Sequence, residues 1–346
     1  ATRVNENGLI EEVASNVPRL DYSDGTCPSL LLENYATNLI TYSEDFSNVA
    51  WTKAGNNVVT LNNSISPDGT LNASTVTGLD GTGANDLYTL ATFNSSNKTV
   101  TYSVYLKGSG TLRINVSNNV DDDSSKTLTL TNNWEKYFIT YSFNASVSTQ
   151  MVCGLDDLSA TATTYEVYGA QLEQNSYATS YIKTVGTTQT RVADTATGSG
   201  SSTVINSSEG VLYFEGSALA DDLTSRDIVL SNGVAQTDFI RIGYSFNSNN
   251  IRLTVFSGNS QVLNTIYNVG DILQINKIAV KWKSGDYALF VNGVEVYVNT
   301  STIIPLSIND LSLGFTSSNN FYGKTKSLQV YTTALSDSEL ISLTTI

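Results

Sequence analysis

Residues 100–107, VTYSVYLK, decide the fold class of this chain, because apolar and polar side chains alternate along the whole stretch. The same alternation recurs in three further stretches, at 112–117 (LRINVS), 137–143 (YFITYSF) and 238–244 (DFIRIGY). Successive side chains of a β-strand point to opposite faces of its sheet, so a period of two is the pattern of a half-buried strand. We therefore predict an all-β fold of antiparallel strands, each with one buried face.

Turn signals separate the predicted strands. Asn292 and Gly293 stand between the apolar stretches 287–291 and 294–298, and both residue types accept the positive φ of a tight hairpin turn. Similar signals occur at 67–69 (PDG), 108–110 (GSG) and 231–233 (SNG). The chain is thus divided into many short strands, as in a β-sandwich.

Helical periodicity is convincing only near the end of the chain. Ser336 and Glu339 have the spacing of a capping box, and Leu335 and Leu340 can form a hydrophobic staple around it. We predict a short C-terminal helix that closes one end of the last sandwich.

A length of 346 residues suggests about two domains. Small polar residues dominate 186–208, which we interpret as a linker. The β-rich blocks on either side, 35–185 and 209–346, each have the size of a β-sandwich. Residues 1–34 fit neither block and are expected to form an extended N-terminal arm.

Composition and charge exclude several functions. The chain has no histidine and two cysteines, which excludes a Ser-His-Asp triad, a Cys-His dyad and an imidazole zinc site. Its net charge of −14 argues against binding to nucleic acid or to an anionic membrane surface. No apolar run approaches the roughly 18 residues of a membrane helix. Cys27 and Cys153 could pair or remain two separate thiols, and the sequence leaves both alternatives open.

The strand faces give a candidate glycan site. If the strands at 100–107 and 112–117 are neighbours, the outward side chains of Tyr105, Lys107, Arg113 and Asn115 share one sheet face. Tyr105 would stack on a sugar ring, and the other three would bond to hydroxyls or to an acidic sugar. The alternative is an ordinary solvated face, or one that packs against another domain or subunit.

Acidic residues give a candidate metal site. Asp121, Asp122 and Asp123 lie in a predicted turn and offer the oxygen ligands that Ca²⁺ requires. The simpler interpretation is a solvated acidic turn, since the loop lacks EF-hand spacing.

The tryptophans and carboxylates do not indicate catalysis. Trp51, Trp134 and Trp282 are interpreted as framework residues, with sugar stacking as the alternative. Glycoside hydrolysis needs two opposed carboxyl groups, one with a raised pKa. The acidic residues fall mostly in polar turns, where nothing raises a pKa in that way. We therefore expect no enzymatic activity.

The first block carries a set of short motifs over about 195 residues: 16–22 (NVPRLDY), 30–33 (LLLE), 37–46 (TNLITYSEDF), 168–173 (YGAQLE), 178–182 (ATSYI) and 190–194 (TRVAD). With these motifs it resembles the carbohydrate-binding-module-like jelly rolls of tailed-phage virion proteins.

The second block has its own motifs, at 278–282 (IAVKW), 289–294 (LFVNGV), 321–324 (FYGK), 327–331 (SLQVY) and 334–340 (ALSDSEL). It resembles laminin-G and concanavalin A-like lectin domains, a likeness that indicates the fold more than an activity.

The two resemblances imply a phage virion surface protein, a tail or head fibre or adhesin, which binds host-surface polysaccharide through lectin-like domains. They imply an extracellular location on the virion, contact with other virion proteins, a homo-oligomer and, in the first block, a structural Ca²⁺. The alternatives are a capsid or baseplate spacer without glycan binding, a polysaccharide depolymerase and a secreted bacterial adhesin.

Overall fold

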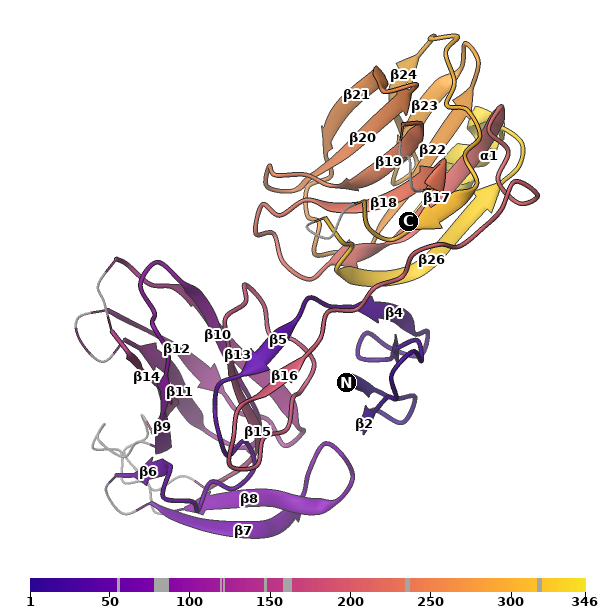
Figure 1. Cartoon of the computed structure of the whole chain (residues 1–346). Coiled ribbons are helices and arrows are strands. Elements are labelled where there is room, and N and C mark those ends of the chain that lie inside the picture. The colour runs from indigo at the N-terminus through magenta and orange to yellow at the C-terminus, as the bar shows by residue number, and fades with distance from the viewer. Residues whose placement is uncertain are drawn as a thin grey trace. The chain divides into compact units, whose positions relative to one another are not determined.

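The computed structural model confirms the all-β prediction, with many antiparallel strands and a single short helix among the described residues (Figure 1). The described residues are 1–346 except 55–56, 78–86, 119, 121, 146–147, 158–163, 234–236 and 316–318.

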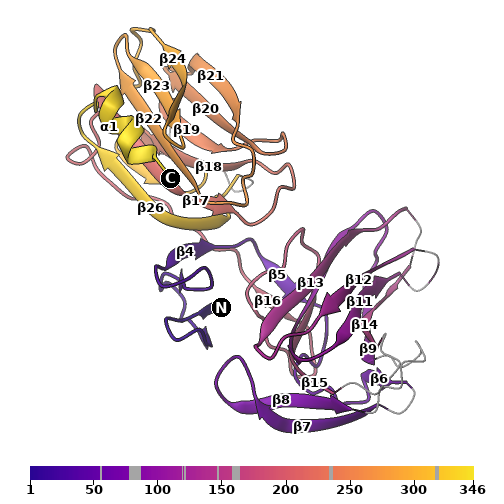
Figure 2. The same ribbon diagram turned by 180° about the vertical axis from the view of Figure 1, so that it is seen from behind.

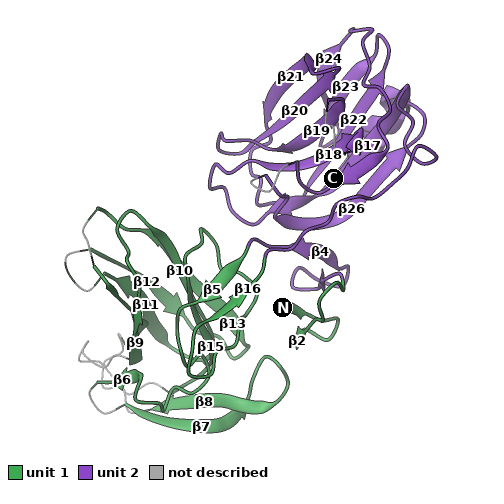
Figure 3. Ribbon diagram, in the orientation of Figure 1, with its two compact units in different colours: residues 1–17, 35–192 green, residues 18–34, 193–346 purple. Residues whose placement is uncertain are grey.

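The chain forms two compact units and passes between them three times (Figure 3). Unit 1 comprises Ala1–Val17 and Tyr35–Val192, and unit 2 comprises Pro18–Asn34 and Ala193–Ile346. The segment 1–34, expected as one extended arm, is therefore divided between the units. The expected linker 186–208 is divided as well. Its residues 186–192 belong to unit 1, where β16 (Gln189–Arg191) pairs with β5 (Ala36–Asn38), and 193–208 belong to unit 2.

Unit 1 is a sandwich of two five-stranded sheets, which we call sheets A and B. Sheet A has the order β13-β10-β15-β8-β7, with bounds Glu135–Ser142, Thr99–Gly108, Tyr165–Glu173, Leu71–Thr77 and Val58–Ile65. Sheet B has the order β12-β11-β14-β9-β6, with bounds Asp123–Thr129, Thr111–Ser117, Gln150–Asp157, Leu87–Thr92 and Trp51–Lys53. A hairpin of β1 (Thr2–Val4) and β2 (Ile10–Glu12) completes the unit.

The core of unit 1 lies between sheets A and B. Tyr102 of β10 and Ile114 of β11 both reach it and are fully buried, as the alternating pattern predicts. Trp51 is also buried, and its indole N–H donates to the carbonyl of Tyr42 at 2.8 Å, which confirms a framework role. Trp134 lies half-buried on the outer side of sheet A.

Unit 2 is a second sandwich, of a seven-stranded sheet C and a five-stranded sheet D. Sheet C has the order β24-β23-β22-β17-β26-β4-β3, with bounds Val294–Asn299, Tyr287–Val291, Asn276–Lys283, Glu209–Ala218, Gly323–Tyr331, Ser29–Leu32 and Leu20–Asp21. Sheet D has the order β21-β20-β19-β18-β25, with bounds Ser260–Asn268, Asn250–Ser257, Phe239–Tyr244, Arg226–Ser231 and Asp310–Ser312. Trp282 lies in the core between them and is fully buried, so it too is a framework residue.

The helix α1 (Asp337–Thr344) begins with the predicted capping box at Ser336 and Glu339. It does not close an end of the sandwich. Leu340 packs against Val211 and Phe290 on the outer side of sheet C, so α1 covers a face of that sheet (Figure 2). Within the part of the chain that the structure describes, no helix has the length and apolarity needed to span a bilayer.

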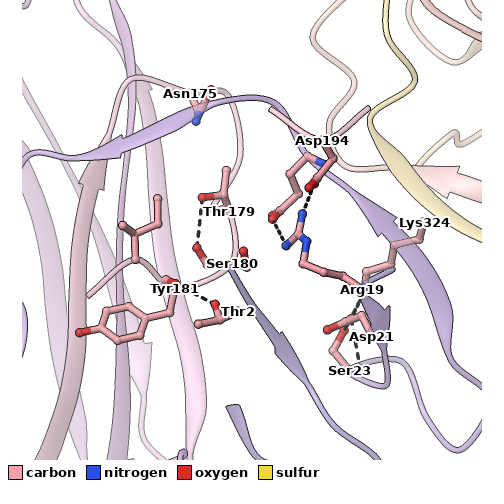
Figure 4. A network of polar contacts seen from close by, with 12 residues as sticks. Thr2, Arg19, Asp21, Ser23, Asn175, Thr179, Ser180, Tyr181, Asp194 and Lys324 are labelled. Atoms are coloured by element: carbon pink, nitrogen blue, oxygen red, sulfur yellow. Dashed lines mark hydrogen bonds and ion pairs between the residues drawn. The ribbon is translucent and has the colours of Figure 1, made fainter. Parts of the chain in front are cut away.

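A buried ion-pair network fixes the early segment Pro18–Asn34 within unit 2 (Figure 4). The guanidinium of Arg19 pairs with Glu33 at 2.7 Å and with Asp194. Burial opposes the charge of Arg19, but the two carboxylates keep its pKa above the ordinary value. The strands β3 and β4, which precede sheets A and B of unit 1 in sequence, thus belong to sheet C of unit 2.

Candidate binding faces

The predicted glycan residues do not share one face. Strand β10, with Tyr105 and Lys107, belongs to sheet A, whereas β11, with Arg113 and Asn115, belongs to sheet B. The glycine-containing turn at 108–110 carries the chain from one sheet to the other instead of joining two neighbours. Because the inward residues of both strands meet in one core, the outward residues lie on opposite sides of unit 1.

The outer side of sheet A is partly covered by the chain itself. Tyr105 packs against Tyr168, with ring centroids 6.2 Å apart, and the Lys136 ammonium lies 5.6 Å from the Tyr105 ring. Ile10 of the β1–β2 hairpin and Tyr181 join the same apolar cluster. Tyr105 is therefore part of a small second core, one of the alternatives to a sugar platform.

Lys107 is engaged nearby on sheet A. Its ammonium lies 3.0 Å from the Glu166 carboxylate and 5.9 Å from the ring centroid of Trp134. Glu166 also accepts a hydrogen bond from Ser64 at 2.6 Å. Lys107 thus belongs to an ion pair on the sheet surface.

The outer side of sheet B brings the other two predicted residues together with three that the sequence analysis did not single out. Asn115 of β11, Gly154 of β14 and Tyr88 of β9 are direct cross-strand neighbours. Arg113 of β11 and Asp156 of β14 are also direct cross-strand neighbours, two residues along these strands from Asn115 and Gly154. The stretch 87–92 (LYTLAT) has apolar residues on both faces, so the sequence pattern did not identify Tyr88 as an outward residue.

Gly154 leaves a gap in this row of side chains. A Cβ at Gly154 would lie 2.5 Å from the Cβ of Tyr88, so only glycine fits there without a shift. The half-exposed Asn115 and Tyr88 flank this position. The row therefore consists of a planar amide, bare backbone and an aromatic ring.

An ion pair borders the gap. The Nε of Arg113 donates to the Asp156 carboxylate at 2.6 Å. The Asp156 side chain is buried, whereas 38% of the Arg113 side chain is exposed. Asp156 thus fixes the guanidinium of Arg113 on the open surface of sheet B. We call Tyr88, Arg113, Asn115, Gly154 and Asp156 the sheet B face.

Of the three aspartates proposed for Ca²⁺, the structure describes Asp122 and Asp123. Asp121 lies outside the described residues. Asp122 accepts hydrogen bonds from the Tyr141 hydroxyl and the Asn144 backbone, both at 2.7 Å. Asp123 is exposed at the start of β12. The described residues contain no group of three acidic or thiol side chains able to hold a metal ion.

The chain is similar to several solved protein structures at low sequence identity. No family model and no curated protein matches the chain. Among solved structures, the Ruminococcus gnavus IT-sialidase CBM40 is 18% identical and covers 44% of this chain and 95% of its own, with a TM-score of 0.36. Domain 4 of the Geobacillus stearothermophilus arabinanase AbnA, in complex with arabinotriose, is 15% identical over 46% of this chain and 73% of its own, with a TM-score of 0.34.

Sheep galectin-11 is a third similar structure, 13% identical over 40% of this chain and 99% of its own, with a TM-score of 0.29. These structural neighbours are carbohydrate-binding modules and lectin-like β-sandwich domains. At these identities and TM-scores the likeness by itself decides nothing about this chain.

Proposed function

We propose that this chain is a glycan-binding protein without enzymatic activity and that the sheet B face is its sugar-binding surface. The observation that carries the proposal is the row Asn115–Gly154–Tyr88 beside the Arg113–Asp156 ion pair. This row places an aromatic ring beside planar hydrogen-bonding groups on the outer side of sheet B.

The chemistry of the sheet B face suits a saccharide. The Tyr88 ring offers a flat apolar surface to the C–H groups of a sugar ring, while its hydroxyl stays in water. The amide of Asn115 both donates and accepts, and the guanidinium of Arg113 donates, as sugar hydroxyls require. A few polar groups around one aromatic ring are enough to orient a small ligand.

We further propose that the protein acts outside the cell on the surface of a phage virion, as a tail or head fibre that contacts host polysaccharide. A single shallow site of this kind binds weakly, and a homo-oligomer with many copies per particle raises the effective concentration. The net charge of −14 suits a surface that does not adhere to nucleic acid. Other virion proteins are the expected neighbours.

The test is a screen of bacterial polysaccharides with the full chain and with Tyr88→Ala. We expect specific signals that weaken about fivefold in this variant, since ring stacking contributes about 1 kcal/mol. Phe138→Ala is the matched control, because Phe138 is an exposed aromatic residue on the outer side of sheet A. It should leave binding unchanged.

Three results would contradict the proposal. Absence of signal from every polysaccharide would favour a capsid or baseplate spacer. Release of reducing ends from any tested polymer would establish a depolymerase instead. Equal losses in Tyr88→Ala and Phe138→Ala would show that binding occurs elsewhere.

A further inference from the structure

The outer side of sheet D, in unit 2, carries three charged side chains on adjacent strands. Asp227 lies on β18, Arg241 on β19 and Arg252 on β20. Gly243 of β19 stands directly between Asp227 and Arg252 in the cross-strand row. Because Gly243 has no side chain, Arg252 reaches across β19 toward the carboxylate. A Cβ at Gly243 would lie 2.0 Å from the backbone oxygen of Arg226.

One carboxylate faces two guanidinium groups in this cluster. An Asp227 oxygen lies 3.6 Å from Arg241 Nη1 and the other lies 3.5 Å from Arg252 Nη2. The Asp227 side chain is only 1% exposed, and those of Arg241 and Arg252 are 14% and 11% exposed. Buried charges are normally retained where opposite charges balance them. Two cations and one anion leave an excess of positive charge on a strongly acidic chain.

The hydrogen bonding of the cluster is incomplete. Among the described residues, three buried atoms of the cluster have no hydrogen-bond partner. They are the Nε of Arg241, the Nε of Arg252 and one oxygen of Asp227. Burial raises the pKa of Asp227, although both arginines and a hydrogen bond from Ser225 oppose that shift. The same desolvation lowers the pKa of Arg241. The internal carboxylate therefore compensates the two guanidinium groups only in part.

Phenylalanine rings flank both guanidinium groups. The Arg241 Cζ lies 4.9 Å from the ring centroid of Phe315, and the Arg252 Cζ lies 4.8 Å from that of Phe246. Phe246 is 55% exposed. A guanidinium over a ring is attracted to it and keeps its N–H groups in its own plane, where a carboxylate can accept two of them.

We infer that the outer side of sheet D binds an acidic saccharide, with Arg241 and Arg252 as the carboxylate-binding residues. The exposed apolar ring of Phe246 beside them would contact the C–H face of the sugar. In the next cross-strand row the buried Thr254 hydroxyl donates to the Asn264 side chain at 2.9 Å, and the exposed amide of Asn264 supplies polar groups for the sugar hydroxyls. This site goes beyond the sheet B face, since it lies in the other unit and selects a charge.

The first test uses the unaltered full chain, so it does not depend on the folding of any variant. Titration calorimetry with trigalacturonic acid should show binding that weakens about tenfold or more when the three carboxyl groups are methyl esters, because charge-assisted hydrogen bonds are lost. Binding should also weaken as salt is raised. Equal binding of acid and ester, or no binding of the acid, would overturn the inference. Glutarate binding as tight as trigalacturonate would overturn the choice of a saccharide.

Variants then locate the site. Arg241→Gln combined with Asp227→Asn removes one cation and one anion, so the net charge of the cluster stays at +1. This double variant should weaken trigalacturonate binding at least tenfold. Lys283→Gln is the matched control, since Lys283 pairs with Glu209 on sheet C and its removal should have no effect. A control variant that loses binding as strongly would place the site elsewhere.

Asp227→Asn alone separates binding from a structural role. It removes the internal competitor for the two arginines, so trigalacturonate affinity should rise several-fold even if the melting temperature falls. Unchanged or weaker affinity in a folded variant would contradict the inference. Tyr88→Ala should leave trigalacturonate binding intact, so failure of the sheet B proposal and failure of this one give different results.

Discussion

Replacing Arg19 by methionine should destabilise unit 2 far more than an exposed ion pair would suggest. The side chains of Arg19 and Glu33 are each only 3% exposed, and Asp194 completes the network. Arg19→Met leaves the Glu33 carboxylate buried without its cation. Breaking a buried pair in this way costs about 3–5 kcal/mol. That loss is a large fraction of a total stability of about 5–15 kcal/mol.

Hydrogen exchange at rising urea, read by mass spectrometry, measures this loss unit by unit. The free energy of opening should fall by about 3–5 kcal/mol for the central strand β22 of unit 2. That of β10 in unit 1 should not change. Arg3→Met is the matched control, because the Arg3–Glu11 pair is partly exposed and should contribute about 0–1 kcal/mol.

A second substitution tests the mechanism. Arg19→Met with Glu33→Gln removes the uncompensated charge, so it should recover much of the lost stability. The reasoning would be refuted if Arg19→Met cost no more than Arg3→Met. A loss that appeared in β10 rather than β22 would refute the placement of Pro18–Asn34 in unit 2.

Three further predictions concern single side chains. Burial opposes ionisation of Asp68, but hydrogen bonds from Thr70 and its neighbours lower its pKa from 3.8 to about 2. The ionised carboxylate of Asp68 stabilises the fold fully above pH 3.8, and this stabilisation is lost as the pH falls toward 2. Asp68→Asn should therefore flatten the fall in melting temperature over that pH range. An unchanged dependence of melting temperature on pH would contradict this. Cys27 is exposed, whereas Cys153 is buried and its pKa is raised. Iodoacetamide should therefore add one label to the folded protein and two labels after denaturation. Two labels on the folded chain would contradict the burial of Cys153. Trp51→Ala should cost about 3–5 kcal/mol of stability in urea unfolding, since it empties a core site, and a loss below 1 kcal/mol would indicate a surface role.

The strand faces of this protein could be predicted from sequence, but the neighbours of each strand could not. Alternation placed Tyr102 and Ile114 in the core correctly, because side-chain direction is a local property of a strand. Sheet membership depends on pairings between distant segments. The turn at 108–110 has the composition of a hairpin, yet it separates Tyr105 and Arg113 into different sheets.

The candidate sites show the same limit. Arg241 could be identified as an outward residue from the alternation in 238–244, but its proximity to Asp227 and Arg252 depends on the order of β18, β19 and β20. The strands β3 and β4 escaped notice because they have two and four residues, too few to show a period. Their position follows from pairing with β26, which no local signal encodes.

The order of synthesis matters for this chain. Lys324 contacts Asp24 across 300 positions of sequence, so the ribosome makes one side of that contact long before the other. All of unit 1 is complete by Val192, whereas β4 must wait for β26. Contacts between such distant positions form slowly. The second sandwich thus cannot be completed until β26 has been made, and until then the waiting strands present unpaired edges that chaperones, or neighbouring nascent chains, can capture.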